Sequence, residues 1–436
     1  MGTRQVLGAL LAACLPATAA FAQASEAWSL HGQITYVGQR KPAFDADYSG
    51  PHSLEVQAEH SYSLTTTLFA GARLWQGAEG YANIEGVQGV PFSNMSGLGG
   101  FTNGELQKTA TTTLSFYRAR LFLRQTFGFG GGTDVVEADA NQLAGPVDRR
   151  RLVVTAGNLA VSDLYDTNAF AHDPRSDFLN WALMGSGAYD YAADARGYTW
   201  GLDVAWQDAG WSLRVGRFLE PRESNGLALD PHIEQHHGDQ VELDRALQVG
   251  GMPGTVRLLA FHNVADMGRY RDALELARLT GTAPDLALVR GRNSKSGLAF
   301  NAEQDLAPDL GVFARASWND GASETYAFTE IDRSLALGAS LRGRTWGRPA
   351  DRAGLAVVGN GISGPHRDYL AAGGLGFFLG DGRLDYRPEH IFEANYVAAL
   401  GARFAIGADL QRIYNPGYNS DRGPVWFFGL RLHASI

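Results

Sequence analysis

Hydrophobic and polar residues alternate with a period of two over nearly the whole chain, which is the pattern of half-buried antiparallel strands. In the first such segment Trp28 and Leu30 fall on one face, and Ser29 and His31 fall on the other. Turn-rich stretches interrupt this alternation. The pattern predicts sixteen strands, over residues 28–39, 61–75, 79–88, 109–127, 150–158, 196–206, 211–220, 238–246, 255–266, 293–304, 309–318, 325–342, 352–360, 387–399, 402–414 and 424–435.

The connections between these segments mostly alternate in length, as they do in bacterial barrels that pair short periplasmic turns with long external loops. Short links fall near 76–78, 207–210, 307–309 and 401, and long links cover 40–60, 89–108, 159–195, 221–237, 267–292 and 361–386, with short exceptions near 319–324 and 415–423. Segment 128–149 is long where a turn is expected. It therefore either projects into the periplasm or marks an error of register.

The amino-acid composition is consistent with a barrel but does not establish one. The chain is 45% hydrophobic and 19% charged, and it has 54 glycines together with 22 Phe, 16 Tyr and 9 Trp. A membrane barrel accounts for these values, because only one face of each strand meets lipid and aromatic residues gather at the two interfaces. A secreted soluble all-β protein would share most of them.

The N-terminal stretch is typical of a secretory signal peptide. Arg4 precedes an apolar core that starts at Val6, and Ala20 and Ala22 frame Phe21. We place cleavage after Ala22, which gives a signal peptide over 1–22 and a single barrel domain over 23–436. No later segment has the roughly 18 uninterrupted apolar residues of a membrane-spanning helix.

The only cysteine, Cys14, allows a second interpretation of the N-terminus. The sequence LAAC resembles the acylation box of a bacterial lipoprotein. Because another small-residue cleavage site follows it, we favour ordinary cleavage. The mature chain then carries no thiol, which excludes disulfides and thiolate chemistry.

The segment SFYRARLFLRQTF suggests a pore lining. Strict alternation places Phe116, Arg118, Arg120, Phe122 and Arg124 on one face. Three arginines near the midplane of a lipid-facing wall would each cost roughly 2–4 kcal/mol, so this face is expected to line the lumen. Guanidinium groups would offer paired donors to sugar hydroxyls, and the rings would lie along the apolar face of a sugar. Alternatively, these arginines only brace an inward-folded loop.

Further polar residues on the predicted lumen faces carry charges of both signs, which fits a neutral polyhydroxylated solute better than an ion. Those predicted to line the pore are His31, Glu85, Asp203, Arg214, Glu242, Arg257, Arg315 and Glu393. Each of them can also be read as general lumen polarity.

The long link 159–195 is the best candidate for a loop that folds into the barrel and narrows it, the alternative being a mobile external loop. The residues expected to form the constriction are Asp163, Asp166, Asn168, Asp177 and Trp181. Acidic members could pair with Arg118, Arg120 and Arg124.

Signals for other functions are weak. His232, Glu234, His236, His237 and Asp239 offer metal-type ligands, but their spacing matches no established zinc pattern, so we expect a solvated loop and no metal or cofactor. With a net charge of −9 and no basic stripe, the chain is not expected to bind nucleic acid. Nucleophile-elbow, Walker and HExxH motifs are absent, so no enzyme activity is expected.

Several long segments in the same order resemble the carbohydrate-selective porin family, the OprB-type sugar porins of Gram-negative bacteria. They are AGNLAVSDLYDTNAFAHDPRSDFLNWALMGSGAYDYAADARGYTWG, RLLAFHNVADMGRYRDAL, ARASWNDG, FTEIDRSLALG, HRDYLAAGGLGFFLGDGRLDY and RGPVWFFGLRLH. The likeness runs from about Trp28 to the end. It implies a sixteen-stranded outer-membrane barrel that passes glucose and related sugars by facilitated diffusion through an arginine-rich constriction.

The resulting prediction is an all-β protein, a closed antiparallel transmembrane barrel in the outer membrane. Its expected partners are small neutral sugars, outer-membrane lipid and lipopolysaccharide, and the barrel-assembly machinery, which would read the C-terminal strand although that strand ends in Ile436 and not in Phe. A homotrimer and a monomer both remain open. The alternatives for function are a general diffusion porin without sugar preference and an outer-membrane enzyme or adhesin.

Overall fold

The computed structural model describes residues 25–436, and the predicted signal peptide, with Cys14, lies outside them. Within the described residues, sixteen strands form one closed barrel in which every strand pairs antiparallel with its neighbours and β1 pairs with β18. The predicted fold class is confirmed.

The barrel strands lie close to the predicted segments. They are β1 (Trp28–Lys41), β2 (Glu59–Trp75), β3 (Ala78–Val90), β4 (Ser115–Gly128), β7 (Arg151–Leu159), β8 (Thr199–Asp208), β9 (Trp211–Phe218), β10 (His237–Val249), β11 (Met252–Gly268), β12 (Arg290–Ala307), β13 (Leu310–Asn319), β14 (Arg333–Gly343), β15 (Arg348–Gly361), β16 (Glu389–Ala399), β17 (Phe404–Tyr414) and β18 (Val425–Ser435).

A separate two-stranded sheet, β5 (Thr133–Val136) with β6 (Gly145–Asp148), lies outside the barrel ladder. The helices all belong to the connections. They are α1 (Trp181–Met184), α2 (Tyr270–Thr280), α3 (Gly364–Ala371) and the short 3-10 turns η1 (Phe92–Met95), η2 (Val161–Asp163), η3 (Leu286–Val289), η4 (Arg344–Trp346) and η5 (Pro416–Tyr418). Among residues 25–436, none of the helices is both long and apolar enough to span a membrane.

The two faces of the wall follow from the side-chain alternation of a strand. On β2, Ser63 and Thr65 are buried toward the lumen, whereas Leu68 is half exposed on the outside. On β8, Asp203 is fully buried while Trp200 and Leu202 face outward. An apolar outer face and a polar inner face are what a barrel in lipid requires.

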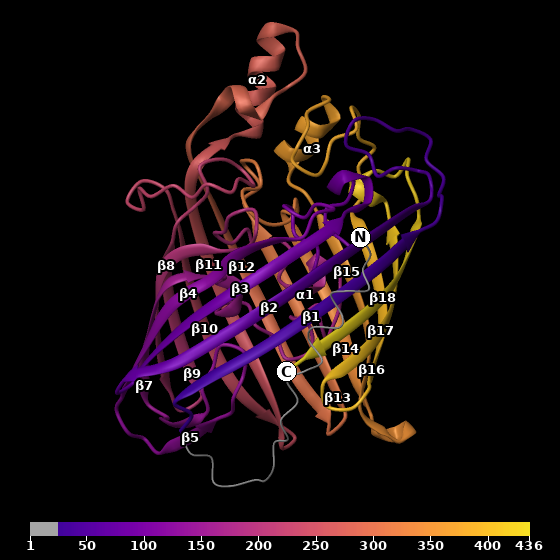
Figure 1. The fold of residues 1–436 in the computed structure, drawn as a ribbon. Helices are drawn as coiled ribbons and strands as arrows, with labels where there is room; N and C mark the ends of the chain where they lie inside the picture. The colour runs from indigo at the N-terminus through magenta and orange to yellow at the C-terminus, as the bar shows by residue number, and fades with distance from the viewer. Residues whose placement is uncertain (1–24) are drawn as a thin grey trace.

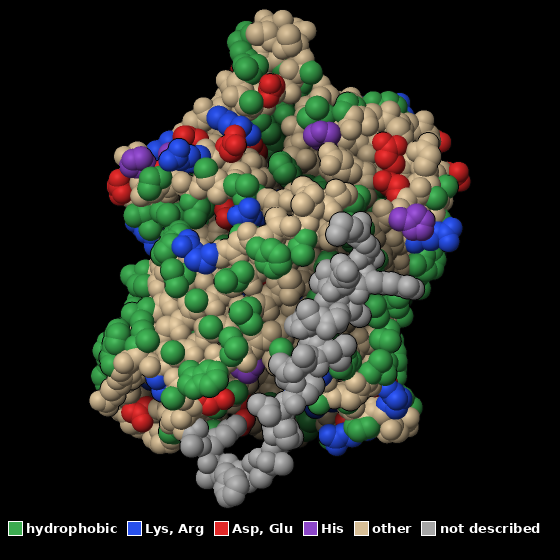
Figure 2. All heavy atoms as spheres, viewed as in Figure 1, with side chains coloured by type: hydrophobic (Ala, Val, Ile, Leu, Met, Phe, Trp, Pro, Cys, Tyr) green, Lys and Arg blue, Asp and Glu red, His purple; other side chains and the backbone are tan. Residues whose placement is uncertain are grey.

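Outward aromatic residues occur at both ends of the strands. Trp28, Trp75 and Trp211 stand at the short-turn ends, and Trp318 and Tyr414 stand at the opposite ends. In Figure 2 hydrophobic side chains spread over the visible wall, while charged side chains gather mainly toward the two ends. This arrangement resembles the interfacial aromatic girdles of outer-membrane barrels.

The two ends of the barrel differ in the length of their connections. The long connections, with α2 and α3, rise from one end, and the short turns lie at the other together with β5 (Figure 1). In outer-membrane barrels the end with long loops is external and the end with short turns is periplasmic.

Two predicted strand starts are wrong. β4 begins at Ser115 and not at 109, and β14 begins at Arg333 and not at 325. At the second site the backbone N–H groups of Tyr326, Ala327 and Phe328 all donate to the carboxylate of Asp190, which lies in the loop between β7 and β8. These bonds hold residues 325–332 inside the barrel mouth, because the N–H groups are then unavailable to a strand ladder.

The long connection at the short-turn end, here called segment 129–150, does not disturb the register, since β4 and β7 pair directly across it. It forms the β5–β6 hairpin, and the connection between these two strands, residues 137–144, turns back toward the lumen. Leu143 and Ala144 are buried, with the Leu143 N–H donating to the hydroxyl of Tyr81 on the inner wall. The segment therefore extends from the periplasmic end and also enters the barrel.

Candidate functional site

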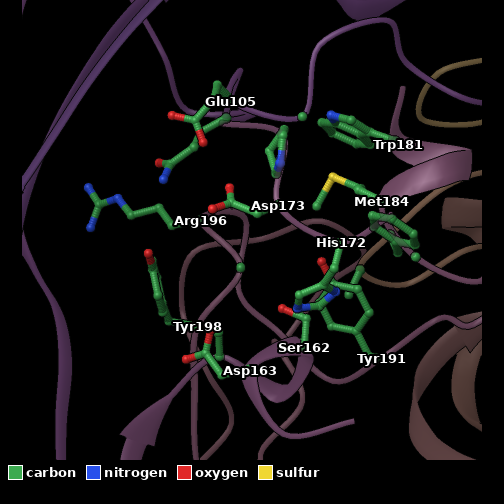
Figure 3. A pocket seen from close by; sticks show the side chains of 18 of the residues that line it. Glu105, Ser162, Asp163, His172, Asp173, Trp181, Met184, Tyr191, Arg196 and Tyr198 are labelled. Carbon is green, nitrogen blue, oxygen red and sulfur yellow. The ribbon is translucent and has the colours of Figure 1, made fainter. Parts of the chain in front are cut away.

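A chamber of about 310 Å³ lies inside the barrel, between the inner face of β3 and β4 and the loops that enter from the external end. The connection between β7 and β8, here called loop 160–198, supplies most of its lining. The charged members are Glu85, Glu105, Lys108, Arg120, Asp163, Asp166, Asp173, Arg175 and Arg196, and the aromatic members are Tyr165, Trp181, Tyr189, Tyr191, Tyr198 and Phe328. In Figure 3, Trp181 and Tyr191 lie on one side, Arg196 and Tyr198 on the other, and Asp173 between them.

Buried wall carboxylates hold loop 160–198 inside the lumen by accepting its backbone N–H groups. Glu393 accepts from Leu179 at 2.5 Å and from Asn180 at 3.0 Å. Glu242 accepts from Asp166 at 2.8 Å. A loop buried in a barrel must satisfy its backbone groups without water, and these wall residues provide the acceptors.

Arg315 makes the corresponding bonds to carbonyl groups. Its side chain is nearly fully buried, and it donates to the carbonyl of Leu183 at 2.6 Å and to that of Asp166 at 3.1 Å. The Asp166 carboxylate lies 3.4 Å from Nε of Arg315 and also accepts from Ser186 Oγ at 2.9 Å. Arg315 therefore fixes two points of the loop at once.

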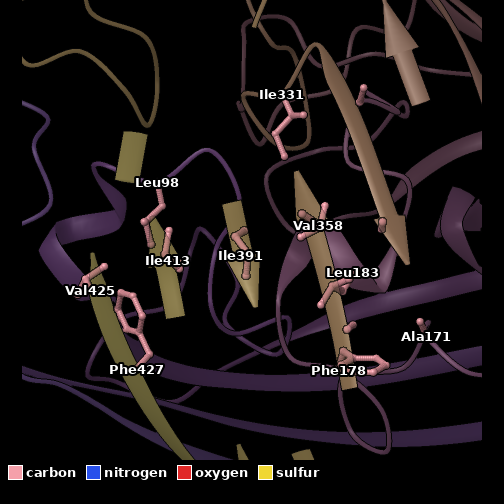
Figure 4. Packing of buried hydrophobic residues seen from close by; sticks show 14 of the residues in the cluster. Leu98, Ala171, Phe178, Leu183, Ile331, Val358, Ile391, Ile413, Val425 and Phe427 are labelled. Atoms are coloured by element: carbon pink, nitrogen blue, oxygen red, sulfur yellow. The ribbon is translucent and has the colours of Figure 1, made fainter. Parts of the chain in front are cut away.

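Apolar packing completes the attachment. Phe178 and Leu183 of the loop belong to one buried cluster with Val358, Ile391 and Phe427, which point inward from β15, β16 and β18 (Figure 4). The wall thus buries hydrophobic surface on its inner side as well, at roughly 25 cal/mol for each Å². The shape of the chamber depends on this packing.

Ion pairs place the arginines on the chamber wall. Arg120 forms a bidentate pair with Asp163, at 2.6 and 2.7 Å, and its guanidinium lies over the ring of Tyr198. Arg175 pairs with Glu105 at 3.1 Å and with Asp173 at 3.5 Å. Held in this way, the guanidinium groups keep a fixed direction while their remaining N–H donors stay available.

Glu85 connects the wall with the loops. It accepts from the hydroxyl of Tyr117, from Tyr198 at 3.2 Å, from Gln107 at 2.6 Å and from Thr67 at 3.1 Å. A buried carboxylate with four donors is an acceptor of fixed position.

Lys108 is a cation without a carboxylate partner among the described residues. Its Nζ donates to Asn225 Oδ1 at 2.6 Å and to the carbonyl of Ala327, and it lies 6.0 Å from the ring centre of Trp181. Burial lowers the pKa of Lys108 to about 8, against the attraction of the Asp190 and Asp194 carboxylates. Lys108 therefore keeps its charge at neutral pH and loses it just above.

The expectation that five residues of β4 share one face is wrong. A β-bulge interrupts the pairing of β3 with β4, since Asn83 opposes Arg120 but the next residue, Ile84, opposes Arg118. The extra residue reverses the alternation. Phe116 and Arg118 therefore face outward, Phe116 being 65% exposed and Arg118 lying over the outward ring of Trp200.

Beyond the bulge the lumen-facing prediction agrees with the structure, but only Arg120 reaches the chamber. Phe122 stacks on Tyr81 with ring centres 4.9 Å apart, and Arg124 lies over both rings. Arg124 donates to the carbonyl of Asn141 in segment 129–150 at 3.0 Å. Of the three arginines expected to pair with acids of loop 160–198, Arg120 alone does so.

The other predicted lumen residues point inward but mostly serve each other or the loop. Asp203 accepts from Arg214 and from Tyr165, and Arg257 pairs with Glu303 at 3.0 Å. The buried Nε2 of His31 has no hydrogen-bond partner within residues 25–436. Glu85 is the one wall residue of this predicted set that lines the chamber, since Glu242, Arg315 and Glu393 anchor the loop.

Three of the five predicted constriction residues line the chamber, namely Asp163, Asp166 and Trp181. Asn168 bonds to Asn301 of the wall at 2.7 Å, and Asp177 pairs with Arg352. These two residues hold the loop and do not face the space it encloses.

Sequence reasoning missed several chamber residues. Arg175 lies in the predicted loop 159–195 but is not among the five expected constriction residues, and Arg196 falls at the start of the predicted strand 196–206. Alternation over the predicted strand 196–206 puts Tyr198 in phase with Trp200, but Tyr198 precedes β8 and turns inward with 8% exposure. Lys108 and Phe328 come from other loops, and only long-range packing brings them here.

The histidine-rich segment is a local hydrogen-bond cluster. Nδ1 of His232 and Nδ1 of His236 each lie 2.7 Å from the carboxylate of Asp230. Burial opposes ionisation of this carboxyl, but hydrogen bonds from both histidines lower the pKa of Asp230 to about 2. Over residues 25–436 no group of three or more His, Cys, Asp and Glu side chains is arranged to hold a metal ion.

The barrel has a fold similar to that of a solved bacterial protein. OprB of Pseudomonas putida, in its high-pH structure, matches 94% of this chain over 94% of its own length, with a TM-score of 0.71 and 18% identity. The outer membrane channel DcaP of Acinetobacter baumannii matches 94% of the chain over 97% of its own, with a TM-score of 0.49 and 9% identity. No curated protein sequence matches the chain.

The family comparison is more specific. The family model described as carbohydrate-selective porin, OprB family, matches residues 56–436, which is most of the chain and includes fifteen of the sixteen barrel strands. The chain belongs to this family and is an outer-membrane porin of the carbohydrate-selective type.

Proposed function

We propose that small neutral sugars, glucose among them, enter the periplasm by facilitated diffusion through the chamber formed by loop 160–198 and the β3–β4 wall. The observation that carries this proposal is the pairing of fixed charged groups with aromatic rings around a space of about 310 Å³. Pockets that bind small molecules combine a ring-lined surface with a few polar groups in the same way.

The charged groups act as hydrogen-bond partners for hydroxyl groups. Arg120 and Arg175 present N–H donors whose direction is set by Asp163 and Glu105, and Glu85 presents an acceptor. Each such bond replaces one to water, so its net contribution is small, about 0.5–1.5 kcal/mol. Weak, multiple bonds suit a channel, in which the solute must leave as readily as it enters.

The aromatic residues orient the sugar ring. Trp181 stacks on Phe328 with an interplanar angle of 8°, and Tyr198 lies across the chamber in Figure 3. The C–H face of a pyranose can lie against such rings while its hydroxyl edge meets the arginines. The two kinds of wall together select for a flat, polyhydroxylated solute.

Charge balance favours a neutral solute. Arg120 pairs with Asp163, and Arg175 pairs with both Glu105 and Asp173. With Lys108 and Arg196, the lining carries basic and acidic side chains in similar number, so neither sign dominates the chamber. A general diffusion porin, the first alternative, would pass any small solute at a rate set by size alone. An enzyme or adhesin, the alternative from another class, would not conduct ions.

The outer wall defines the remaining partners of the proposal. Lipid and lipopolysaccharide surround it, and Arg118 beside Trp200 offers a cation at the external interface. The barrel-assembly machinery would read β18, whose alternation ends at Ile436. A homotrimer would bury part of the apolar wall.

Liposome swelling with the purified protein tests the proposal. Glucose, a disaccharide and a neutral non-sugar of the size of glucose are compared. We expect glucose to enter faster than the size-matched non-sugar. Equal rates for these two would reduce the protein to a general diffusion porin.

A further inference from the structure

Segment 129–150 is long where a periplasmic turn would suffice, and it enters the lumen from that side. Residues 137–139 are exposed, whereas Leu143 and Ala144 are buried against the inner wall. The chain is clamped there by Glu26, whose N–H donates to the Ala144 carbonyl at 3.0 Å and whose carboxylate accepts from the Ala144 N–H at 2.7 Å. Arg73 donates to the same carbonyl at 3.0 Å. These hydrogen bonds hold the part of segment 129–150 that enters the lumen in a fixed position.

The tip of the re-entrant part reaches the layer next to the chamber. Asn141 accepts from Asn83 at 2.9 Å through its side-chain oxygen. Asn83 is the residue that opposes Arg120 across the β3–β4 pair, and Arg120 lines the chamber. Asn141 thus lies against the wall beside the base of the chamber, on its periplasmic side.

Arg124 holds the same tip from the next layer of the wall. It stands four residues from Arg120 on the same strand, which is roughly 13 Å along the strand and about 10 Å along the axis of the barrel because the strands are tilted. Its Nη1 donates to the Asn141 carbonyl at 3.0 Å, and its guanidinium lies 3.8 Å from Glu79. A solute that leaves the chamber toward the periplasm has to pass this layer.

Two polar groups at this point have no partner among the described residues. The Oδ1 of Asn83 is buried and accepts no hydrogen bond. The amide nitrogen of Asn141 donates to no group, although its oxygen and its backbone carbonyl are both engaged. Asn83 is fully buried and positions the Asn141 side chain, whose partly exposed amide nitrogen is within reach of a passing hydroxyl group.

From this arrangement we infer that residues 137–144 form a second constriction below the chamber and that Asn141 is a specificity-determining residue there. This inference rests on the proposed function, because it assumes that sugars leave the chamber by this route. The permeating sugar is then filtered twice. Loop 160–198 selects it at the entrance, and the tip of segment 129–150 limits its size at the exit.

A single cysteine tests the placement, since the only native cysteine, Cys14, lies in the predicted signal peptide. Asn141→Cys is reconstituted in planar bilayers and treated with a methanethiosulfonate reagent that carries a trimethylammonium group. Val135→Cys is the matched control, because Val135 lies in the same hairpin with 61% exposure. We expect a stepwise loss of conductance for Asn141→Cys and none for Val135→Cys. An unchanged conductance after complete labelling of Asn141→Cys would overturn the inference.

A shortened variant covers the case in which the cysteine variant assembles poorly. Residues 138–142 are replaced by two glycines, and swelling is measured with glucose and a disaccharide. We expect a larger conductance and a higher ratio of disaccharide to glucose entry than in the parent protein. A parent-like ratio with parent-like conductance contradicts a second constriction. If the parent protein itself shows no preference for glucose, the proposed function is contradicted. The conductance of the shortened variant relative to the parent then tests the second constriction on its own.

Discussion

Two segments enter the barrel from opposite ends, and they are held in different ways. Loop 160–198 is fixed by buried charged side chains of several strands, among them Arg315, Glu242 and Glu393. Segment 129–150 is fixed near one side only, by Leu143 and by hydrogen bonds from β2, β3 and β4. The first is a rigid part of the chamber, and the second is attached at its tip.

This difference in attachment predicts how changes in each segment affect stability and permeation. Removing one partner of a buried charged network is costly, because the other partner stays buried and unpaired. Removing an apolar contact also costs the lost burial and a cavity term, but where only the docking of a segment depends on the contact, this cost falls on docking and not on the barrel. Changes in the anchors of loop 160–198 should therefore affect both stability and permeation, whereas changes in segment 129–150 should affect permeation alone.

The largest effect is expected for Arg315→Ala. The change removes two bonds to loop carbonyls and leaves the Asp166 carboxylate without its cation. We expect a loss of about 3–5 kcal/mol in the free energy of unfolding, as for other broken buried pairs, together with a larger and noisier conductance. Thermal unfolding and single-channel recording measure the two effects. Arg333→Ala, which removes an exposed arginine of the neighbouring strand β14, should show neither. If the R315A protein keeps the parental Tm, the loop is not anchored through this side chain.

A smaller effect is expected for Leu143→Ala. The side chain is 3% exposed and packs in one cluster with Tyr81 and Phe122. A buried leucine-to-alanine change costs about 2–5 kcal/mol, but here we expect the cost to fall on docking of the segment. Limited proteolysis should cut near 138–142 faster while the Tm of the barrel stays unchanged. Val135→Ala serves as the control. If the Tm falls for L143A but not for the control, docking of segment 129–150 and stability of the barrel are not independent.

The smallest effect is expected from pH. Because the pKa of Lys108 is lowered to about 8 by burial, the side chain is charged below that pH and neutral above it. Raising the pH from 7 to 9 removes one positive charge from the chamber, so the ratio of cation to anion permeability should rise. Reversal potentials in a salt gradient measure this ratio. Lys108→Gln should remove this part of the pH dependence, and an unaltered pH profile in that variant would assign the titration to another group.

Much of the barrel could be predicted from the alternation of residues, because the hydrophobic and polar positions within each strand show which residues face outward and which face the lumen. The number of strands, their order and most of their limits follow from that local signal. Local alternation cannot reveal the bulge at Ala119, which places Arg118 and Arg120 on opposite faces. It cannot show that Asp190 takes the N–H groups of residues 326–328 either, because that contact joins loops far apart in the sequence.

The chamber was less predictable than the barrel for the same reason. Arg120 and Asp163 could be named from the sequence, since one lies on a strand with a strong pattern and the other in a conspicuously long loop. Lys108, Tyr198 and Phe328 could not be named, because nothing in their local sequence marks them. The three come from different connections, and the folding of loop 160–198 into the lumen brings them together.

The pair Arg120→Ala and Arg118→Ala, compared in liposome swelling, tests the central claim most directly. Arg120 faces the chamber in a bidentate pair with Asp163, and Arg118, two residues away, lies outside over Trp200. With a net contribution of about 0.5–1.5 kcal/mol for each hydrogen bond, the loss of one or two such contacts can abolish a preference of about tenfold. We predict that Arg120→Ala removes the preference for glucose over a size-matched neutral non-sugar and that Arg118→Ala retains it. Loss of the preference in Arg118→Ala alone, or its survival in Arg120→Ala, would contradict the account.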